Sequence, residues 1–260
     1  MLVSWLIGLV LLQGSPSLPA CPEFEVASSS LPERRAALDA CAAAANQKPI
    51  DFFLDLVSKL APHDSRTDRY GAVAAGWSAE ELSQEHICAR LLAILDEKGS
   101  SASARVVALR ALHALPPEKR PPSARVIDQF SIEITAVPAQ MSYDIKAFTV
   151  SPGALVHLTL HNPDGLEHNL LVVAPGSLAE MGTAGDRMGQ VPDGRAKEFV
   201  PDSAKVLSVM GLVAPGKSSS MWFVAPLTPG TYPYVCTYPA HWRTMNGKMK
   251  VAAPAAAAAQ

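Results

Sequence analysis

The chain has 260 residues, of which 48% are hydrophobic, and a formal net charge of −2. This length suffices for one large domain or two smaller ones, and the hydrophobic content supports a folded core. A net charge so close to zero gives no electrostatic basis for binding nucleic acid or an anionic membrane surface, so we expect no nucleic-acid partner.

The first twenty residues carry no charged side chain, and an apolar run extends from Leu2 to Leu12. This run is shorter than the about 20 apolar residues that span a bilayer. Followed by Ser, Pro and Ala, it is typical of a secretory signal peptide. We therefore predict a signal peptide over 1–20 and an exported protein, in the periplasm or on the outer cell surface. The alternative is a buried N-terminal helix.

Four cysteines need an assignment: Cys21, Cys41, Cys88 and Cys236. The motif LPAC, which ends at Cys21, resembles a bacterial lipobox, and lipidation of Cys21 would anchor the chain to a membrane. In that case Cys41 and Cys88 are left to form a disulfide in an oxidising compartment. The alternatives are a Cys21–Cys41 disulfide with Cys88 as a buried free thiol, or no disulfide.

Residues 21–116 show a helical apolar period. Two Ser-x-x-Glu motifs, at 30–33 and 78–81, have the form of a capping box ahead of Ala- or Leu-rich runs, and Pro49 is placed to begin a helix. We predict a small bundle or HEAT-like hairpins over 21–116, followed by a Pro-rich linker over 117–128.

From residue 129 the apolar period changes to two. Short runs rich in Val, Thr, Tyr and Leu are separated by Pro-Gly, Asn-Pro-Asp-Gly and Pro-Gly-Lys turns, which favours an antiparallel sandwich. We predict an all-β Greek-key sandwich over 129–252, with an irregular flap and a short helix within 174–204. The Ala-rich tail over 253–260 is predicted to be disordered.

Metal ligands are concentrated in one stretch, CTYPAHWRTM, which contains Cys236, His241 and Met245. His168 stands where a turn enters an earlier predicted strand. Two imidazoles and one thiolate, with a thioether able to sit farther away, form the ligand set of a blue (type 1) copper centre. A short loop between two strands can direct Cys, His and Met to one point only if they lie a few residues apart. The sequence therefore predicts a mononuclear copper site.

The segment from about 131 to 252 resembles the azurin and plastocyanin group of the cupredoxins, and the azurins most closely. CTYPAHWRTMNGKMKV has the azurin spacing Cys-Thr-aromatic-Pro-small-His-x-x-x-Met, followed by a final strand. The stretch HNL, which begins at His168, matches the first copper-binding histidine of the azurins and the asparagine that follows it. KVLSVMGLVAPGKSSSMWF is similar to the strand-turn-strand that precedes the cysteine. The helical half lies outside the resemblance.

The resemblance implies His168, Cys236 and His241 as equatorial ligands and Met245 as the axial ligand. It also places the backbone carbonyl of Glu167 where azurins bring a glycine carbonyl toward copper.

Two further residues have implied roles outside the ligand set. By the same resemblance, Asn169 and Thr237 form hydrogen bonds between the two ligand loops or near the cysteine sulfur, and such bonds tune a metal site. The alternative for both is an ordinary turn or strand residue.

The neighbours of the cysteine argue against copper enzymes. Multicopper oxidases flank this cysteine with histidines, but Thr237 follows Cys236 here, and the binuclear site of respiratory oxidases needs a second cysteine where this chain has Ala240. His157 and His161 are the only candidates for a further all-histidine site. We therefore predict an electron carrier and not an enzyme. The alternatives are a periplasmic copper carrier or sensor, or a helical half that docks the copper domain to a membrane complex.

Electron exchange is expected through the ligand loop. We predict that His241 is the partly exposed ligand, that Pro239, Ala240 and Trp242 form an apolar docking patch, and that Arg243 lies at its rim. The partner would be a redox protein, such as a cytochrome or a copper enzyme, and such transient encounters bury less than about 1,200 Å².

Overall fold

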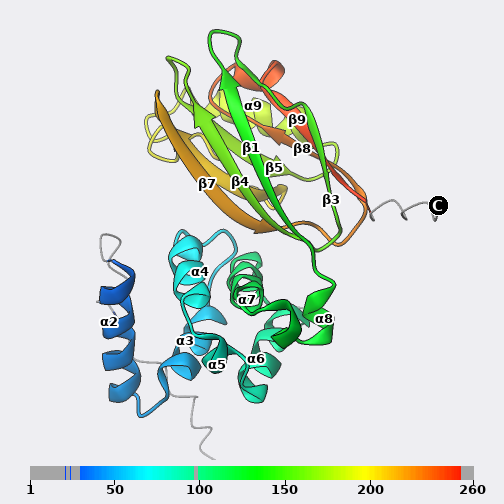
Figure 1. The fold of residues 1–260 in the computed structure, drawn as a ribbon. Coiled ribbons are helices and arrows are strands. Elements are labelled where there is room, and N and C mark those ends of the chain that lie inside the picture. Colours follow the sequence, from blue (N-terminus) through cyan, green and yellow to red (C-terminus); the bar gives the residue numbers. More distant parts are fainter. Residues whose placement is uncertain (1–20, 22–23, 25–29, 97–98, 253–260) are drawn as a thin grey trace, which may run out of the picture. The chain divides into compact units, whose positions relative to one another are not determined.

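The computed structural model describes residues 21, 24, 30–96 and 99–252, and the chain divides into two compact units, Met1–Leu56 and Val57–Gln260. The predicted signal peptide over 1–20 and the tail over 253–260 lie outside the described residues. Figure 1 labels the helices and strands. No helix within the described ranges is long and apolar enough to span a membrane.

The first unit contains α2 (Leu31–Ala44) and α3 (Pro49–Val57, which ends one residue into the second unit). The predicted capping box at α2 is present: the Glu33 N–H donates to Ser30 Oγ, and the Ser30 N–H donates to Glu33 Oε2 at 2.6 Å. Pro49 is the first residue of α3, where its missing N–H costs no helical hydrogen bond.

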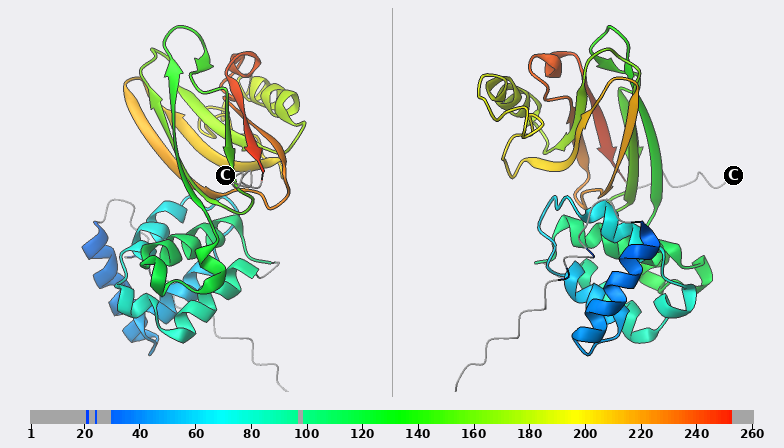
Figure 2. Two further views of the ribbon diagram at one scale, coloured as in Figure 1. Left: turned by 45° about the vertical axis from the view of Figure 1, so that its right-hand side comes forward. Right: turned by 90° about the vertical axis from the view of Figure 1, so that its left-hand side faces the viewer.

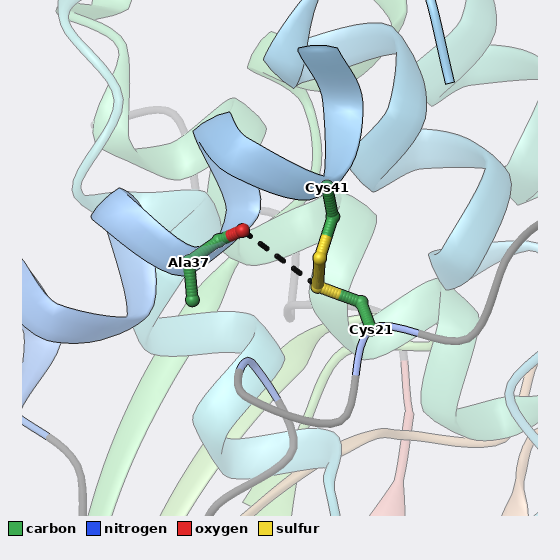
Figure 3. Close-up of a disulfide and its surroundings, with 3 residues drawn as sticks. All are labelled: Cys21, Ala37 and Cys41. Atoms are coloured by element: carbon green, nitrogen blue, oxygen red, sulfur yellow. Dashed lines mark hydrogen bonds between the residues drawn. A yellow bond between two sulfur atoms is a disulfide. The ribbon is translucent and has the colours of Figure 1, made fainter. Parts of the chain in front are cut away.

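Cys21 forms a disulfide with Cys41 of α2, and its Sγ lies 3.7 Å from the Ala37 carbonyl oxygen (Figure 3). Their Cα atoms are 5.9 Å apart, inside the range that disulfides require. Of the three alternatives, the structure has the Cys21–Cys41 disulfide, and the Cys41–Cys88 pair is wrong; Cys88 is a free thiol, half-buried rather than buried. A Cys21 sulfur held in this disulfide is not available for a lipid thioether.

In its described residues, the second unit begins with five α-helices and one short 3-10 helix. They are α4 (Thr67–Ala75), α5 (Ala79–Leu82), α6 (Glu85–Asp96), α7 (Ala102–Ala114), η1 (Pro117–Lys119) and α8 (Pro122–Arg125). The second capping box, Ser78 with Glu81, starts only the four-residue α5. The pattern did not predict α4, whose Ala- and Gly-rich sequence has few large apolar residues. Val106 and Leu109 of α7 are buried with Leu155 of the sandwich.

The Pro-rich stretch is more ordered than a linker. Arg120 donates hydrogen bonds to the carbonyls of His113 and Leu115, and Arg125 donates to those of Glu118 and Arg120. Prolines that begin η1 and α8 keep their fixed φ at the first turn of a helix, where they are compatible with it.

The strands form a sandwich of two sheets, ordered β2-β1-β4-β7 and β3-β9-β8-β5-β6 (Figure 1). Their bounds are β1 Gln129–Val137, β2 Ser142–Tyr143, β3 Ala147–Val150, β4 Leu155–Asn162, β5 His168–Val173, β6 Val206–Val213, β7 Lys217–Val224, β8 Gly230–Val235 and β9 Asn246–Val251. Most of the strand pairs in the described residues are antiparallel, as the pattern indicated, whereas Greek-key crossings between the sheets make β1 and β4, and β3 and β9, run parallel. The predicted Greek-key sandwich after a helical region is confirmed.

The sandwich brings the predicted ligands to one end. β5 begins at His168, β8 ends one residue before Cys236, and β9 begins one residue after Met245. The predicted short helix is α9 (Leu178–Met188), longer than expected, and it lies beside η2 (His241–Arg243) in every view (Figures 1 and 2).

Candidate metal centre

Three potential ligand atoms converge in the interior. His168 Nδ1 lies 3.2 Å from His241 Nδ1 and 4.0 Å from Cys236 Sγ, and His241 Nδ1 lies 3.7 Å from the same sulfur. All three side chains are buried. No other group of three or more His, Cys, Asp or Glu side chains in the described residues has such an arrangement.

The triangle has the size that one transition-metal ion requires. An ion about 2.0–2.3 Å from each of three nitrogen or sulfur atoms in a trigonal plane separates those atoms by roughly 3.5–4 Å. The observed separations of 3.2–4.0 Å are close to this range. Two imidazoles and one thiol are also the donors expected at a type 1 copper site, so the residues fit copper in both kind and spacing.

Met245 lies in the same core as the cysteine. Its side chain is fully buried in the cluster that contains Cys236, and its carbonyl accepts a hydrogen bond from the Cys236 N–H at 3.0 Å. This bond joins the two ends of the ligand loop.

Burial determines the protonation of the ligands before any metal binds. Burial raises the pKa of the Cys236 thiol to about 12, against the effect of the Asn169 and Tyr238 backbone N–H groups. Burial and the neighbouring His168 lower the pKa of His241 to about 4, while Asp164 opposes them. At neutral pH His241 is therefore a neutral imidazole with a lone pair to donate, whereas Cys236 must lose a proton to bind metal.

Asn169 and Thr237 connect the two ligand segments. The Thr237 N–H donates to Asn169 Oδ1 at 2.7 Å, and Asn169 Nδ2 donates to Thr237 Oγ1 at 2.9 Å. The Nδ2 group also donates to the Glu198 carbonyl, and Asn169's own carbonyl accepts from the Tyr143 hydroxyl. Since these groups are buried, the hydrogen bonds fix the distance between His168 and the cysteine loop.

An acidic residue that the sequence pattern did not single out contacts a ligand directly. His168 Nε2 lies 3.0 Å from Asp164 Oδ2. The Ala139 N–H and the His168 ring, together with the Gly165 N–H, hold the pKa of Asp164 below its usual range. The signal available in the sequence was the i, i+4 spacing of Asp164 and His168 around a turn, which alone has many other meanings.

Helix α9 holds the ligand loop from outside. Asp186 accepts hydrogen bonds from the Ala240 N–H at 2.6 Å, from Trp242 Nε1 at 2.9 Å and from Arg243 at 3.1 Å. A Cβ on Gly185 would lie 2.3 Å from the Thr237 carbonyl oxygen, so only glycine permits this approach.

His241 is only 4% exposed, so the prediction of a partly exposed ligand is wrong. Tyr238 stacks on its ring at a centroid separation of 4.6 Å, and α9 lies beside the loop. Trp242 is half-buried against the apolar cluster that contains Met181 of α9, and its Nε1 donates a hydrogen bond to Asp186.

The rest of the predicted patch is more open. Ala240 is exposed, with φ of 71°, and Pro239 is half-buried. Arg243 is exposed, and its guanidinium lies over the Trp242 ring.

The Glu167 side chain forms an ion pair with Arg195, and its Oε1 accepts a hydrogen bond from Arg195 Nη2 at 2.9 Å.

The two strand histidines, His157 and His161, do not join the site. His157 stacks on Trp222, and His161 Nδ1 lies 2.8 Å from Ser218 Oγ.

Comparisons with known proteins match the strand-rich part of the chain. A family model described as copper binding proteins, plastocyanin/azurin family, matches residues 130–252. Auracyanin-A of Chloroflexus aurantiacus is 30% identical over 123 residues, which are 46% of this chain and 74% of that protein.

Two other similar proteins match over nearly the same length. Azurin of Achromobacter denitrificans is 30% identical over 120 residues, 43% of this chain and 77% of that protein. Outer membrane protein H.8 of Neisseria gonorrhoeae is 28% identical over 128 residues, 49% of this chain and 66% of that protein, slightly under two thirds of its length.

Proposed function

Because this chain belongs to the plastocyanin/azurin family of copper-binding proteins, we propose that it is an exported carrier of single electrons between redox proteins. Its cofactor is copper, and its strand-rich part is a blue copper cupredoxin domain. We propose that the copper-binding domain spans residues 129–252 and that a helical domain spans residues 21–116.

We assign His168, Cys236 and His241 as the equatorial ligands, Met245 as the axial ligand, and the Glu167 carbonyl as a further contact. The observation that carries the assignment is the buried triangle of two Nδ1 atoms and one Sγ, with no side longer than 4.0 Å.

When bound, copper supplies a Cu(I)/Cu(II) couple that exchanges one electron. The chain's own residues keep the ligands in place in both states. Asn169 ties the His168 strand to Thr237, and Asp186 holds the loop that carries His241. Because these bonds do not depend on the metal, little of the site has to rearrange when the charge of the ion changes.

Several features favour a carrier over an enzyme. Val235 and Thr237 flank Cys236, and Ala240 stands four residues on, so the chain has no histidine or second cysteine at the positions where larger copper sites need them. His157 and His161 are engaged by other side chains. Burial of the ligands also disfavours a carrier that hands its copper to another protein, because release would require the loop to open.

We propose that the redox partner docks at the exposed part of the ligand loop. Ala240 is exposed there, and two large apolar side chains stand on neighbouring segments: Met141 at 44% and Leu166 at 47% exposure. Thr244 Oγ1 donates to the Met141 carbonyl, which places the first of these beside the loop. Such a small apolar surface suits a brief encounter with a cytochrome or a copper enzyme.

Export is supported by the Cys21–Cys41 disulfide, since disulfides persist in oxidising compartments. One similar protein is named for the outer membrane. We propose a periplasmic or outer-surface location, with Cys21 in its disulfide.

The full chain loaded with Cu(II) tests the function. We expect an intense visible thiolate-to-copper band, absent in Cys236→Ser, and a redox titration that takes up one electron per chain. Placing a charge at the exposed loop with Ala240→Asp should slow exchange with a redox protein without changing the band. A colourless Cu(II) complex, or copper transferred to an acceptor protein with no electron exchange, would overturn the proposal.

A further inference from the structure

One ligand is held on the side of its ring that faces away from the other ligands. His168 Nε2 lies 3.0 Å from Asp164 Oδ2, while His168 Nδ1 faces His241 and Cys236. The imidazole is fully buried, and the Asp164 side chain is only 9% exposed. A carboxylate can only accept, so Nε2 carries the hydrogen and Nδ1 keeps its lone pair toward the centre.

The carboxylate is itself fixed in place. Asp164 Oδ1 accepts hydrogen bonds from the Ala139 N–H at 3.1 Å and from the Gly165 N–H at 2.7 Å. The Asp164 N–H donates to Asn162 Oδ1 at 3.1 Å. Asp164 Oδ1 thus accepts the hydrogen bonds of the turn, and Asp164 Oδ2 accepts the hydrogen bond from His168. A residue that served only the turn would need the first oxygen alone.

The charge of this partner has a consequence for the redox couple. A hydrogen-bonded carboxylate makes a metal-bound imidazole a stronger donor, and a negative charge near the site stabilises the more positive of two metal states. Asp164 is nearly excluded from water, so its charge is weakly screened.

We propose that Asp164 is a positioning residue of the copper centre, which selects the His168 tautomer with a free Nδ1 and stabilises Cu(II) relative to Cu(I). The proposal rests on the assignment of His168 as a ligand in the proposed function. It adds that the reduction potential of this protein is held down by a carboxylate outside the ligand set.

The variant Asp164→Asn removes the charge while keeping an oxygen that can accept the turn's hydrogen bonds. Loss of such a partner costs about 10–100-fold in metal affinity. If Cu(II) loses about tenfold more affinity than Cu(I), the reduction potential rises by about 59 mV.

Asp144→Asn is the matched control. Asp144 Oδ1 also accepts from two backbone N–H groups, those of Thr135 and Ile145, each at 2.7 Å, but it bonds no ligand. The control removes a carboxylate with similar backbone hydrogen bonds, but Asp144 is exposed and bonds no ligand, so we expect its potential to stay close to that of the wild type. An Asp164→Asn protein that keeps the visible band and has the same potential and Cu(II) affinity as the control would overturn the proposal.

A second measurement does not depend on the variant folding. Nitrogen NMR of the isotope-labelled wild-type apoprotein should show His168 with its proton on Nε2, and a proton on Nδ1 would refute the selection of the tautomer. The outcomes also separate the two proposals. Absence of the visible band in the wild type defeats the proposed function, whereas a normal band with an unshifted potential in Asp164→Asn defeats only the role of Asp164.

Discussion

The close approach of helix α9 to the ligand loop can be tested at Gly185. A Cβ at this position would lie 2.3 Å from the Thr237 carbonyl oxygen and 3.0 Å from Thr237 Cβ. The nearest atom belongs to the backbone next to Cys236 and cannot rotate away as a side chain could. Gly185→Ala therefore forces α9 to withdraw from the loop by about 1 Å.

Two opposing contributions determine the expected free energy of unfolding. Overpacking of a tightly fitted contact costs about 1–3 kcal/mol. Replacing glycine by alanine inside a helix stabilises it by about 1 kcal/mol. We expect Gly185→Ala to be less stable than the wild type by about 1–2 kcal/mol, since a backbone contact places the cost in the upper part of its range.

Urea unfolding of the apoprotein, followed by tryptophan fluorescence and far-UV circular dichroism, measures this difference. Thr183→Ala is the matched control, because Thr183 is exposed on the same helix. We expect the control to be stabilised by a few tenths of a kcal/mol. A Gly185→Ala protein as stable as the control would refute the packing of α9 against Thr237.

Three further predictions concern protons, hydrogen bonds and the disulfide. Since the pKa of Cys236 is about 12 and that of His241 about 4, Cu(II) uptake at neutral pH should release about one proton, measurable in weakly buffered solution. From neutral pH up to the pKa of the thiol, apparent affinity should then rise about tenfold per pH unit, and uptake with no proton release would contradict the buried thiol. Asp186→Ala removes three hydrogen bonds to the ligand loop and should destabilise the protein by about 1.5–3 kcal/mol in the same unfolding assay, with Asp193→Ala as an exposed control on the following turn. Reduction of the Cys21–Cys41 disulfide, which closes a separation of 20 residues, should cost about 3 kcal/mol of stability in the first unit, as reported by proteolysis there, and should leave the visible copper band unchanged.

The loop that carries three candidate ligands could be identified from the sequence because these residues are close together in the chain. Cys236, His241 and Met245 lie within ten residues, so covalent geometry limits where they can point, and the period-two pattern places the loop between strands. His168 was predicted as a further candidate ligand from its position where a turn meets a strand. The capping boxes at Ser30 and Ser78 were readable for the same reason, since each involves residues only three apart.

The contacts that control the site depend on distant parts of the chain. Asp186 accepts a hydrogen bond from the N–H of Ala240, which lies 54 residues further along the chain. Nothing in the sequence pattern of α9 indicates a contact with that loop. The burial of His241 follows from this packing, which is why the prediction of a partly exposed ligand was wrong. Likewise, the pairing of Cys41 with Cys21 rather than with Cys88 joins residues 20 apart in the chain, and their spacing alone does not specify it.

By itself, then, the sequence predicted the kind of metal centre and four candidate ligand residues and determined the class of fold, because donor chemistry and short spacings are properties of local segments. Only the tertiary structure decided the surroundings: which carboxylate bonds His168, which helix covers the loop and which strands run parallel. The physical reason is that burial and hydrogen bonding between separate segments arise when the two sheets and α9 pack together, and no short stretch contains that information.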